Sequence, residues 1–298
     1  MCWQEAGGVN PRKWGAGGGS LERFTASDGV QIAYEVSGKG RALVLLHGLM
    51  AHRGFFHAQK PLESEFQLIT IDLRGHGASR IEGERPSVAR IACDVSELVE
   101  HLDVREAIGV GWSLGASVLW QVLAGPVSRR FAGAVIIDMT ARVLNEGDWQ
   151  LGLSPETCEA RSAAIRDDYR SFALAAGQNI FAQPVENGMR ELAAWSGEQF
   201  GRNDPATMGA VWESLVATDD RPLLAGITQP TLIVHGGKSQ LYGPETARQL
   251  ASALPHARIL TFESSGHAPH MEQPELFNAA IRDFAASLPP VHQTEPTA

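Results

Sequence analysis

The pentapeptide Gly111-Trp112-Ser113-Leu114-Gly115 separates two segments of different character. An apolar run at 107–110 precedes it, and a run rich in helix formers at 116–123 follows it. This order predicts a buried strand, a sharp turn and a helix, which is the context of the nucleophile elbow G-x-S-x-G. The two glycines let the backbone crowd around the turn, so that the serine hydroxyl stands clear of the sheet edge. We therefore interpret Ser113 as the candidate nucleophile.

A motif this short also occurs by chance, so the rest of the chain has to support it. The apolar run at 42–46 is typical of a strand buried on both faces, and it ends in His47-Gly48-Leu49. A backbone amide just beyond such a strand can donate to the oxyanion that develops when a serine attacks a carbonyl. We predict that the N–H groups of Leu49 and Leu114 form this oxyanion hole.

Two further predicted strands lead into loops that contain histidine. The strand at 257–262 precedes a glycine-bearing loop with His267 and His270, and the strand at 66–71 precedes a tight turn with His76. An imidazole titrates near neutral pH, so a histidine just past a strand is suited to act as a general base. We predict this role for His267. We interpret His76 as part of a packed turn and His270 as a surface or capping residue.

These segments together resemble the α/β-hydrolase superfamily, in its single-domain serine esterase-like branch. The resemblance covers about residues 21–288 and lies in five motifs that occur in the familiar order: LVLLHGLM, ITIDLRGHGAS, GVGWSLGAS, PTLIVHG and SSGHAPHMEQPELFN. It implies an α/β fold with a doubly wound, mostly parallel sheet, an inserted helical cap, and catalytic loops at the carboxyl ends of the strands. Haloalkane dehalogenases and epoxide hydrolases of the superfamily have an aspartate where this chain has Ser113. The serine implies acyl transfer to water through an acyl-enzyme.

The chain departs from the family pattern at the third member of the triad. Relatives usually carry an acid a few residues after the His-Gly that follows the strand at 231–234. Here that loop reads His235-Gly236-Gly237-Lys238-Ser239, and Ser239 or its neighbours occupy the place of the acid. A neutral serine cannot stabilise an imidazolium as a carboxylate does. Either the acid comes from elsewhere or the triad is degraded.

Asp138 is the candidate that the order of strands favours. It ends the predicted strand at 134–137, the next strand after the elbow helix, and some branches of the superfamily take their acid from this place. An aspartate here can also serve only to hold loops through backbone N–H groups. We predict that Asp138 orients His267, with Glu245 and Glu263 as weaker alternatives.

Composition and the resemblance together predict one hydrolase domain with an insertion. We expect a flexible leader at 1–20, core segments at 21–138 and 223–288, a helical cap at 139–222 and a disordered tail at 289–298.

The segment at 139–222 is rich in aromatic residues, and aromatic side chains in helices are more often core than ligand contacts. We expect each to pack in the cap and some to line the site: Trp149, Tyr169, Phe172, Phe181, Trp195, Phe200 and Trp212. Trp112, beside the nucleophile, either packs beneath the sheet edge or touches the substrate. Arg142 is the early cap cation considered for a substrate carboxylate, although a solvated role is favoured for it.

The charge balance limits the partners of the chain. A formal net charge of −9 argues against nucleic acid and anionic membrane surfaces, because both require a basic face. Cys2, Cys93 and Cys158 show neither metal-ligand spacing nor a paired framework, which is typical of a reduced cytoplasmic protein. Neither a secretory signal nor a run long enough to span a bilayer is visible in the sequence.

The resulting hypothesis is a serine hydrolase that cleaves carboxylic esters, including lactones, of small molecules without a metal or organic cofactor. A cofactor-free perhydrolase or haloperoxidase-like enzyme, or a hydrolase of carbon-carbon bonds, would use the same triad. A hypothesis of another class is a hydrolase-like sensor of small molecules with vestigial turnover, for which the serine at position 239 is the main support.

Overall fold

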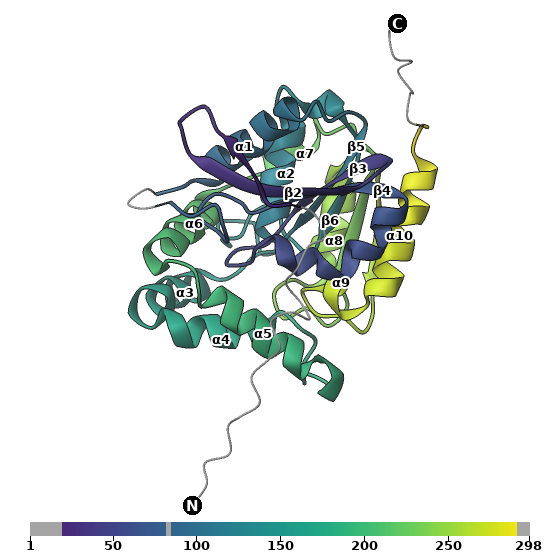
Figure 1. Cartoon of the computed structure of the whole chain (residues 1–298). Coiled ribbons are helices and arrows are strands. Elements are labelled where there is room, and N and C mark those ends of the chain that lie inside the picture. The colour runs from purple at the N-terminus through teal and green to yellow at the C-terminus, as the bar shows by residue number, and fades with distance from the viewer. Residues whose placement is uncertain (1–19, 82–84, 291–298) are drawn as a thin grey trace, which may run out of the picture.

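A computed structural model describes residues 20–81 and 85–290, so most of the predicted leader and of the predicted tail lies outside the described residues. The chain forms an eight-stranded sheet in the order β1-β2-β4-β3-β5-β6-β7-β8. Figure 1 shows this sheet with helices packed around it. The pairs β1/β2 and β2/β4 are antiparallel and the others are parallel. The strands are β1 (Glu22–Thr25), β2 (Gln31–Gly38), β3 (Arg41–Leu46), β4 (Phe66–Ile71), β5 (Ala107–Trp112), β6 (Phe131–Ile137), β7 (Thr231–Gly236) and β8 (Ala257–Phe262). The predicted fold class is confirmed.

Helices cover both faces of the sheet. Leu119 of α2 (Leu114–Ala124) packs on Gly109 of β5, while Phe284 of α10 (Pro274–Ser287) packs on Gly133 of β6. Gly133 pairs with Ile108, the neighbour of Gly109, so the two helices lie on opposite faces. The other core helices are α1 (Val88–His101), α7 (Arg221–Leu224), α8 (Pro244–Ala253) and α9 (Pro269–Glu272), with 3₁₀ segments η2 (Arg53–Ser64) and η3 (Ser128–Arg130). A third 3₁₀ segment, η4 (Asn187–Met189), lies between β6 and β7.

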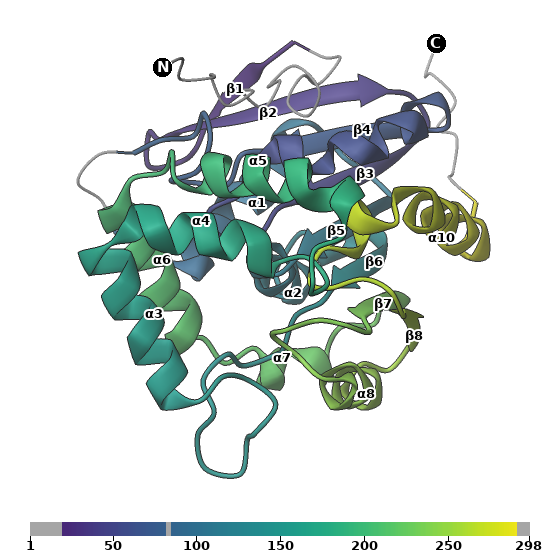
Figure 2. The ribbon, with the colours of Figure 1, turned by 90° about the horizontal axis from the view of Figure 1, so that it is seen from below.

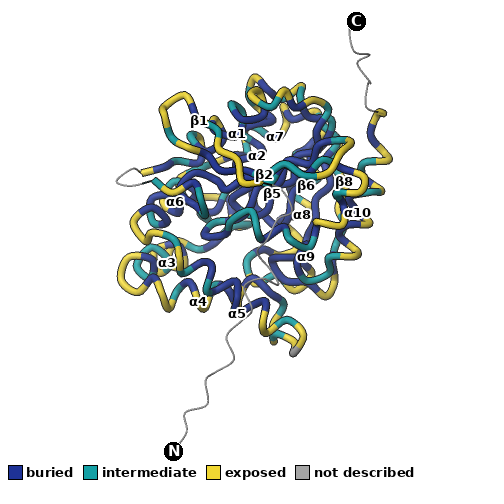
Figure 3. The backbone as a smooth tube through the Cα atoms, viewed as in Figure 1, coloured by how far each residue is buried: buried dark blue, intermediate teal, exposed yellow. Residues whose placement is uncertain are grey.

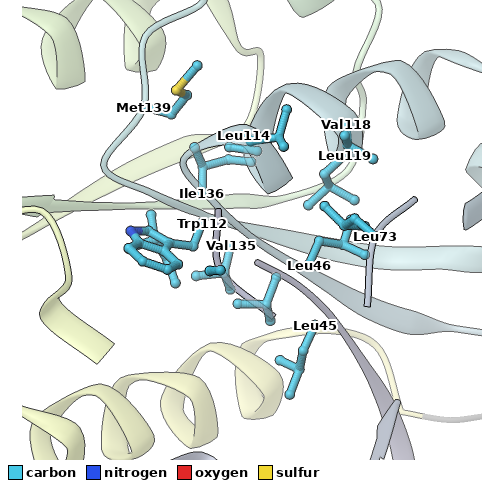
Figure 4. Packing of buried hydrophobic residues seen from close by; sticks show 14 of the residues in the cluster. Leu45, Leu46, Leu73, Trp112, Leu114, Val118, Leu119, Val135, Ile136 and Met139 are labelled. Atoms are coloured by element: carbon cyan, nitrogen blue, oxygen red, sulfur yellow. The ribbon is translucent and has the colours of Figure 1, made fainter. Parts of the chain in front are cut away.

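The central strands are buried, as their continuous apolar runs require. Figure 3 shows buried backbone, in dark blue, through the middle of the sheet and exposed backbone, in yellow, at the outer turns. Figure 4 shows side chains of β3, β5 and β6, among them Leu45, Trp112 and Ile136, gathered beside the start of α2. This packed layer fixes the carboxyl ends of the three strands relative to one another.

The segment between β6 and β7 holds four long helices, α3 (Pro155–Asp167), α4 (Tyr169–Asn179), α5 (Arg190–Phe200) and α6 (Pro205–Ala217). The helices α3 and α6 each begin with a proline in the first turn and a capping side chain. Ser154 accepts from Thr157 N–H in α3, and Asp204 accepts from Thr207 N–H in α6. The four helices lie together beyond one side of the sheet (Figure 2). We call the segment at 139–222 the cap. Its boundaries remain a prediction.

No helix in the described part of the chain is long and apolar enough to cross a bilayer.

Candidate active site

Ser113 lies at the sharp turn between β5 and α2. Its backbone has φ 53° and ψ −119°, in a region that non-glycine residues rarely adopt. A Cβ on Gly115 would lie 2.1 Å from the carbonyl oxygen of Leu46, and one on Gly111 would lie 2.4 Å from the carbonyl oxygen of Gly115. Both positions therefore require glycine, because backbone atoms that cannot move aside surround them. The packing around this turn holds the strained backbone of Ser113 in place.

His267 contacts Asp138 directly. Its Nδ1 lies 2.7 Å from Oδ2 of Asp138, and both side chains are almost completely buried. His267 comes from the loop after β8, and Asp138 follows β6 with its backbone at φ 43°. A hydrogen bond of this kind fixes the orientation of an imidazole and stabilises its protonated form.

The carboxylate of Asp138 accepts from four groups. Besides His267, these are His235 Nδ1 at 3.0 Å, Gly236 N–H at 3.2 Å and the Ser239 hydroxyl at 2.6 Å. Burial raises the pKa of Asp138, but the hydrogen bonds from His235, His267 and Ser239 outweigh it and hold the pKa below its ordinary value. Asp138 is therefore ionised at neutral pH.

The two weaker candidates for the acid lie elsewhere. Glu245 is exposed at the start of α8 and pairs with Arg248. Glu263 is exposed in the turn after β8. Of the carboxylates considered in the sequence, the described structure brings Asp138 to the imidazole.

The loop after β3 lies against the nucleophile. A Cβ on Gly48 would lie 3.2 Å from Cβ of Ser113, and Leu49 follows directly. His47 anchors the loop, because its Nδ1 contacts Gly48 O at 2.8 Å while its Nε2 accepts from Leu73 N–H at 3.0 Å. Leu114 begins α2, and the first amides of a helix have no acceptor within it. The two predicted oxyanion donors thus belong to residues near the nucleophile, Leu114 directly after Ser113 in the chain and Leu49 directly after Gly48. Their role stays a prediction.

Trp112 is buried beneath the histidine loop. Its Nε1 donates to the carbonyl oxygen of His267 at 2.8 Å, and the residue also belongs to the cavity wall. The side chain therefore supports the backbone of His267 beside the cavity. Both of the roles considered for Trp112 in the sequence are compatible with this position.

A cavity of about 180 Å³ contains Ser113 and His267 in its wall. The core contributes Gly48, Leu49 and Tyr242, and the cap contributes a largely apolar roof that includes Phe172, Ala176, Ile180, Phe200, Trp212 and Leu215. Three of the seven cap aromatics noted in the sequence thus face the cavity. Among the described residues that line it, Arg161 alone carries a permanent charge.

Arg142 does not belong to this wall. It pairs with Glu146 and lies 3.9 Å from Asp219, so its charge is compensated outside the cavity. Arg161 was missed in the sequence, although its spacing contains a signal. It lies three residues after Cys158 and four before Ile165, the two buried residues of α3, and so shares their face of the helix.

The other histidines noted in the sequence are buried. Burial lowers the pKa of His76 to about 4, and its Nδ1 bonds to the carbonyl oxygen of Arg74. The surface or capping role expected for His270 is wrong, because His270 is fully buried against Phe56 and Trp112 and burial holds its pKa well below the ordinary value. Both residues are neutral core side chains at physiological pH.

Glu272 is another residue that sequence reasoning missed. Its carboxylate accepts from Gly266 N–H at 2.7 Å and from Ala182 N–H at 2.8 Å. It therefore joins the histidine loop to the stretch of the cap that directly follows α4. Burial raises its pKa to about 7.

In the described part of the chain, no group of three or more His, Cys, Asp or Glu side chains is arranged to hold a metal ion.

Comparisons with known proteins show the family of the chain. A family model described as the alpha/beta hydrolase family matches residues 43–280. The pimeloyl-[acyl-carrier protein] methyl ester esterase of Nitrosomonas europaea is 31% identical over 255 residues, which cover 83% of this chain and 96% of that protein. The enzyme of the same description from Nitrosospira multiformis is 29% identical, covering 86% and 98%.

Two solved structures extend the comparison. An esterase from Exiguobacterium antarcticum superposes with a TM-score of 0.84 at 24% identity, covering 89% of this chain and 99% of that one. A putative aryl esterase from Burkholderia cenocepacia has a TM-score of 0.77 at 27% identity, covering 90% and 98%.

Proposed function

This chain belongs to the alpha/beta hydrolase family, and we propose that it is a serine hydrolase that cleaves carboxylic esters through an acyl-enzyme on Ser113. The observation that carries the proposal is the 2.7 Å contact between His267 and Asp138, beside a cavity whose wall also contains Ser113. Nucleophile, acid and base follow the ends of β5, β6 and β8. Along the chain the order is Ser113, Asp138, His267, which is the order of triad residues in this fold.

The proposed reaction has two stages. Ser113 attacks the ester carbonyl while His267 takes the hydroxyl proton and Asp138 stabilises the resulting imidazolium. The N–H groups of Leu49 and Leu114 donate to the oxyanion, and His267 returns the proton to the leaving alcohol. Water, activated by His267, then attacks the acyl-enzyme and releases the acid and Ser113.

The cavity sets the size of the substrate. An apolar protein cavity of about 150 Å³ holds benzene, and the cavity beside Ser113 measures about 180 Å³. It therefore suits a short acyl chain or a single ring, with a small alcohol as leaving group. The curated relatives are named for a methyl ester, which is an ester of the smallest alcohol.

The sensor hypothesis loses its main support, because a carboxylate does contact His267 although position 239 is a serine. The perhydrolase and carbon-carbon hydrolase hypotheses require the same triad, and no feature of the cavity favours them over ester hydrolysis.

We also propose a cytoplasmic location. Cys93 and Cys158 are free thiols in the described structure, as expected in a reducing compartment. Cell fractionation that recovers the protein from an oxidising compartment would contradict this location.

The test of the proposed function is removal of the nucleophile. Ser113→Ala should abolish release of p-nitrophenol from short acyl esters, while Ser252→Ala, on the exposed face of α8, should retain wild-type rates. A fluorophosphonate should label the wild type once per chain and leave Ser113→Ala unlabelled. Retained turnover or labelling in Ser113→Ala would refute the assignment.

A further inference from the structure

Arg161 brings a guanidinium into the wall of the catalytic cavity. It lies on α3 of the cap, on the same face as the buried residues Cys158 and Ile165. Ser113 and His267 belong to the wall of the same cavity. The cavity that contains the nucleophile in its wall is therefore also bordered by the positive charge of Arg161.

This guanidinium has no carboxylate partner among the described residues. Its charged group lies 5.6 Å from the centre of the Trp212 ring, and the titratable groups that interact with it electrostatically are the Tyr242 phenol and the Cys158 thiol. Burial raises the pKa of both neighbours, so both are neutral at pH 7. Burial also lowers the pKa of Arg161, which means that its charge is held there at a cost in free energy.

Three other arginines of the cap each have a carboxylate partner. Arg142 pairs with Glu146, Arg166 with Asp167 and Arg170 with Glu198. The contrast matters because an arginine stays protonated at physiological pH, and a half-buried guanidinium in an apolar wall is stabilised only in part by an aromatic ring. An anion that enters the cavity would supply the missing counter-charge.

We propose that Arg161 binds a carboxylate of the substrate, and that this enzyme prefers half esters of short dicarboxylic acids to neutral esters of the same length. The proposal rests on the proposed esterase function. One guanidinium offers a planar fork that matches one carboxylate in a bidentate geometry. The apolar roof formed by residues such as Phe172 and Leu215 would contact the methylene chain between the two ends of the substrate.

The test compares methyl half esters with methyl esters of monocarboxylic acids of equal chain length, such as methyl hydrogen glutarate and methyl pentanoate, by titration of the released acid. The wild type should prefer the half ester. In Arg161→Gln the ratio of kcat/KM values, half ester over neutral ester, should fall about ten- to hundredfold, mostly through KM, because a charge-assisted hydrogen bond is lost. Arg161→Lys should retain an intermediate ratio, since it keeps the charge without the fork.

Arg166→Gln is the matched control. Arg166 lies on the same helix and is exposed, and its substitution removes the same charge. Its ratio should equal that of the wild type. An unchanged ratio in Arg161→Gln, or a wild type that cleaves both esters equally well, would overturn the proposal.

A binding measurement separates this proposal from the esterase function. Glutarate should raise the thermal unfolding temperature of Ser113→Ala and leave that of the double variant Ser113→Ala/Arg161→Gln unchanged. If the wild type cleaves no ester while this difference persists, the esterase function fails and the anion site stands. If glutarate stabilises both proteins equally, the anion site fails whatever the turnover.

Discussion

The Ser239 hydroxyl donates a hydrogen bond of 2.6 Å to Oδ2 of Asp138, the same oxygen that contacts His267 at 2.7 Å. The residue at the usual place of the acid thus supports an acid that comes from the neighbouring strand. This is possible because β6 and β7 are adjacent and parallel, so their carboxyl ends meet at one edge of the sheet. A carboxylate can reach His267 from either strand end.

We predict that Asp138→Asn folds but loses roughly three to four orders of magnitude in kcat, as in other serine triads. The amide oxygen can still accept from Gly236 N–H and His235, but its NH₂ group would face Nδ1 of His267 and favour the wrong tautomer. The kcat for a p-nitrophenyl ester measures the effect, with circular dichroism as the check on folding. A folded variant with near wild-type turnover would show that Asp138 is not the acid.

A second carboxylate at position 239 should restore part of this activity. In Asp138→Asn/Ser239→Asp, the longer side chain can place an oxygen near the present position of Asp138 Oδ2, and we expect kcat to recover about tenfold or more over Asp138→Asn. Asp138→Asn/Ser239→Asn is the matched control, because it has the same shape without the charge. Equal rates in the two double variants would mean that the loop after β7 cannot deliver an acid.

The sheet could be predicted from the sequence because strands buried on both faces appear as continuous apolar runs. The runs at 66–71 and 257–262 coincide with β4 and β8. The run at 107–110 begins where β5 begins, and the strand continues to Trp112. The strand, turn and helix around Ser113 were visible for a similar reason, since close backbone contacts restrict Gly111 and Gly115 to glycine. These features are local or periodic, and the sequence displays them directly.

The partners of Asp138 and the charge in the cavity could not be predicted in the same way. Ser239 and Asp138 are 101 positions apart, and their contact depends on the order of the strands in the sheet. Arg161 and Arg142 are both cap arginines. Which of them faces the cavity depends on the packing of α3 against the other cap helices. Arg142 instead pairs with Glu146 outside the cavity.

The stability of the protein should depend on the ionisation of Asp220, which bonds to Ser117 and Gln121 of α2. Burial raises its pKa to about 6, above its ordinary value near 4. The folded state therefore favours the protonated acid. This contribution to the free energy of unfolding is complete below about pH 4, and about 3 kcal/mol of it is lost as the pH rises through 6. Asp220→Asn resembles the protonated acid, so its unfolding free energy in urea should rise relative to wild type between pH 4 and pH 7. A difference that is constant with pH would refute this account.

Gly115→Ala should destabilise the protein although Gly115 lies in the first turn of a helix. Helix propensity alone favours alanine by about 1 kcal/mol, but the added Cβ would lie 2.1 Å from Leu46 O and 2.9 Å from His47 O. The clash pushes α2 away from β3, and we expect a loss of about 3 kcal/mol or more in unfolding free energy together with loss of turnover, since the same turn carries Ser113. Gly188→Ala is the control, because no atom lies within 4 Å of its added Cβ, and it should change stability by less than about 1 kcal/mol. If the two variants are equally stable, the close approach of the elbow to β3 does not restrict position 115 to glycine.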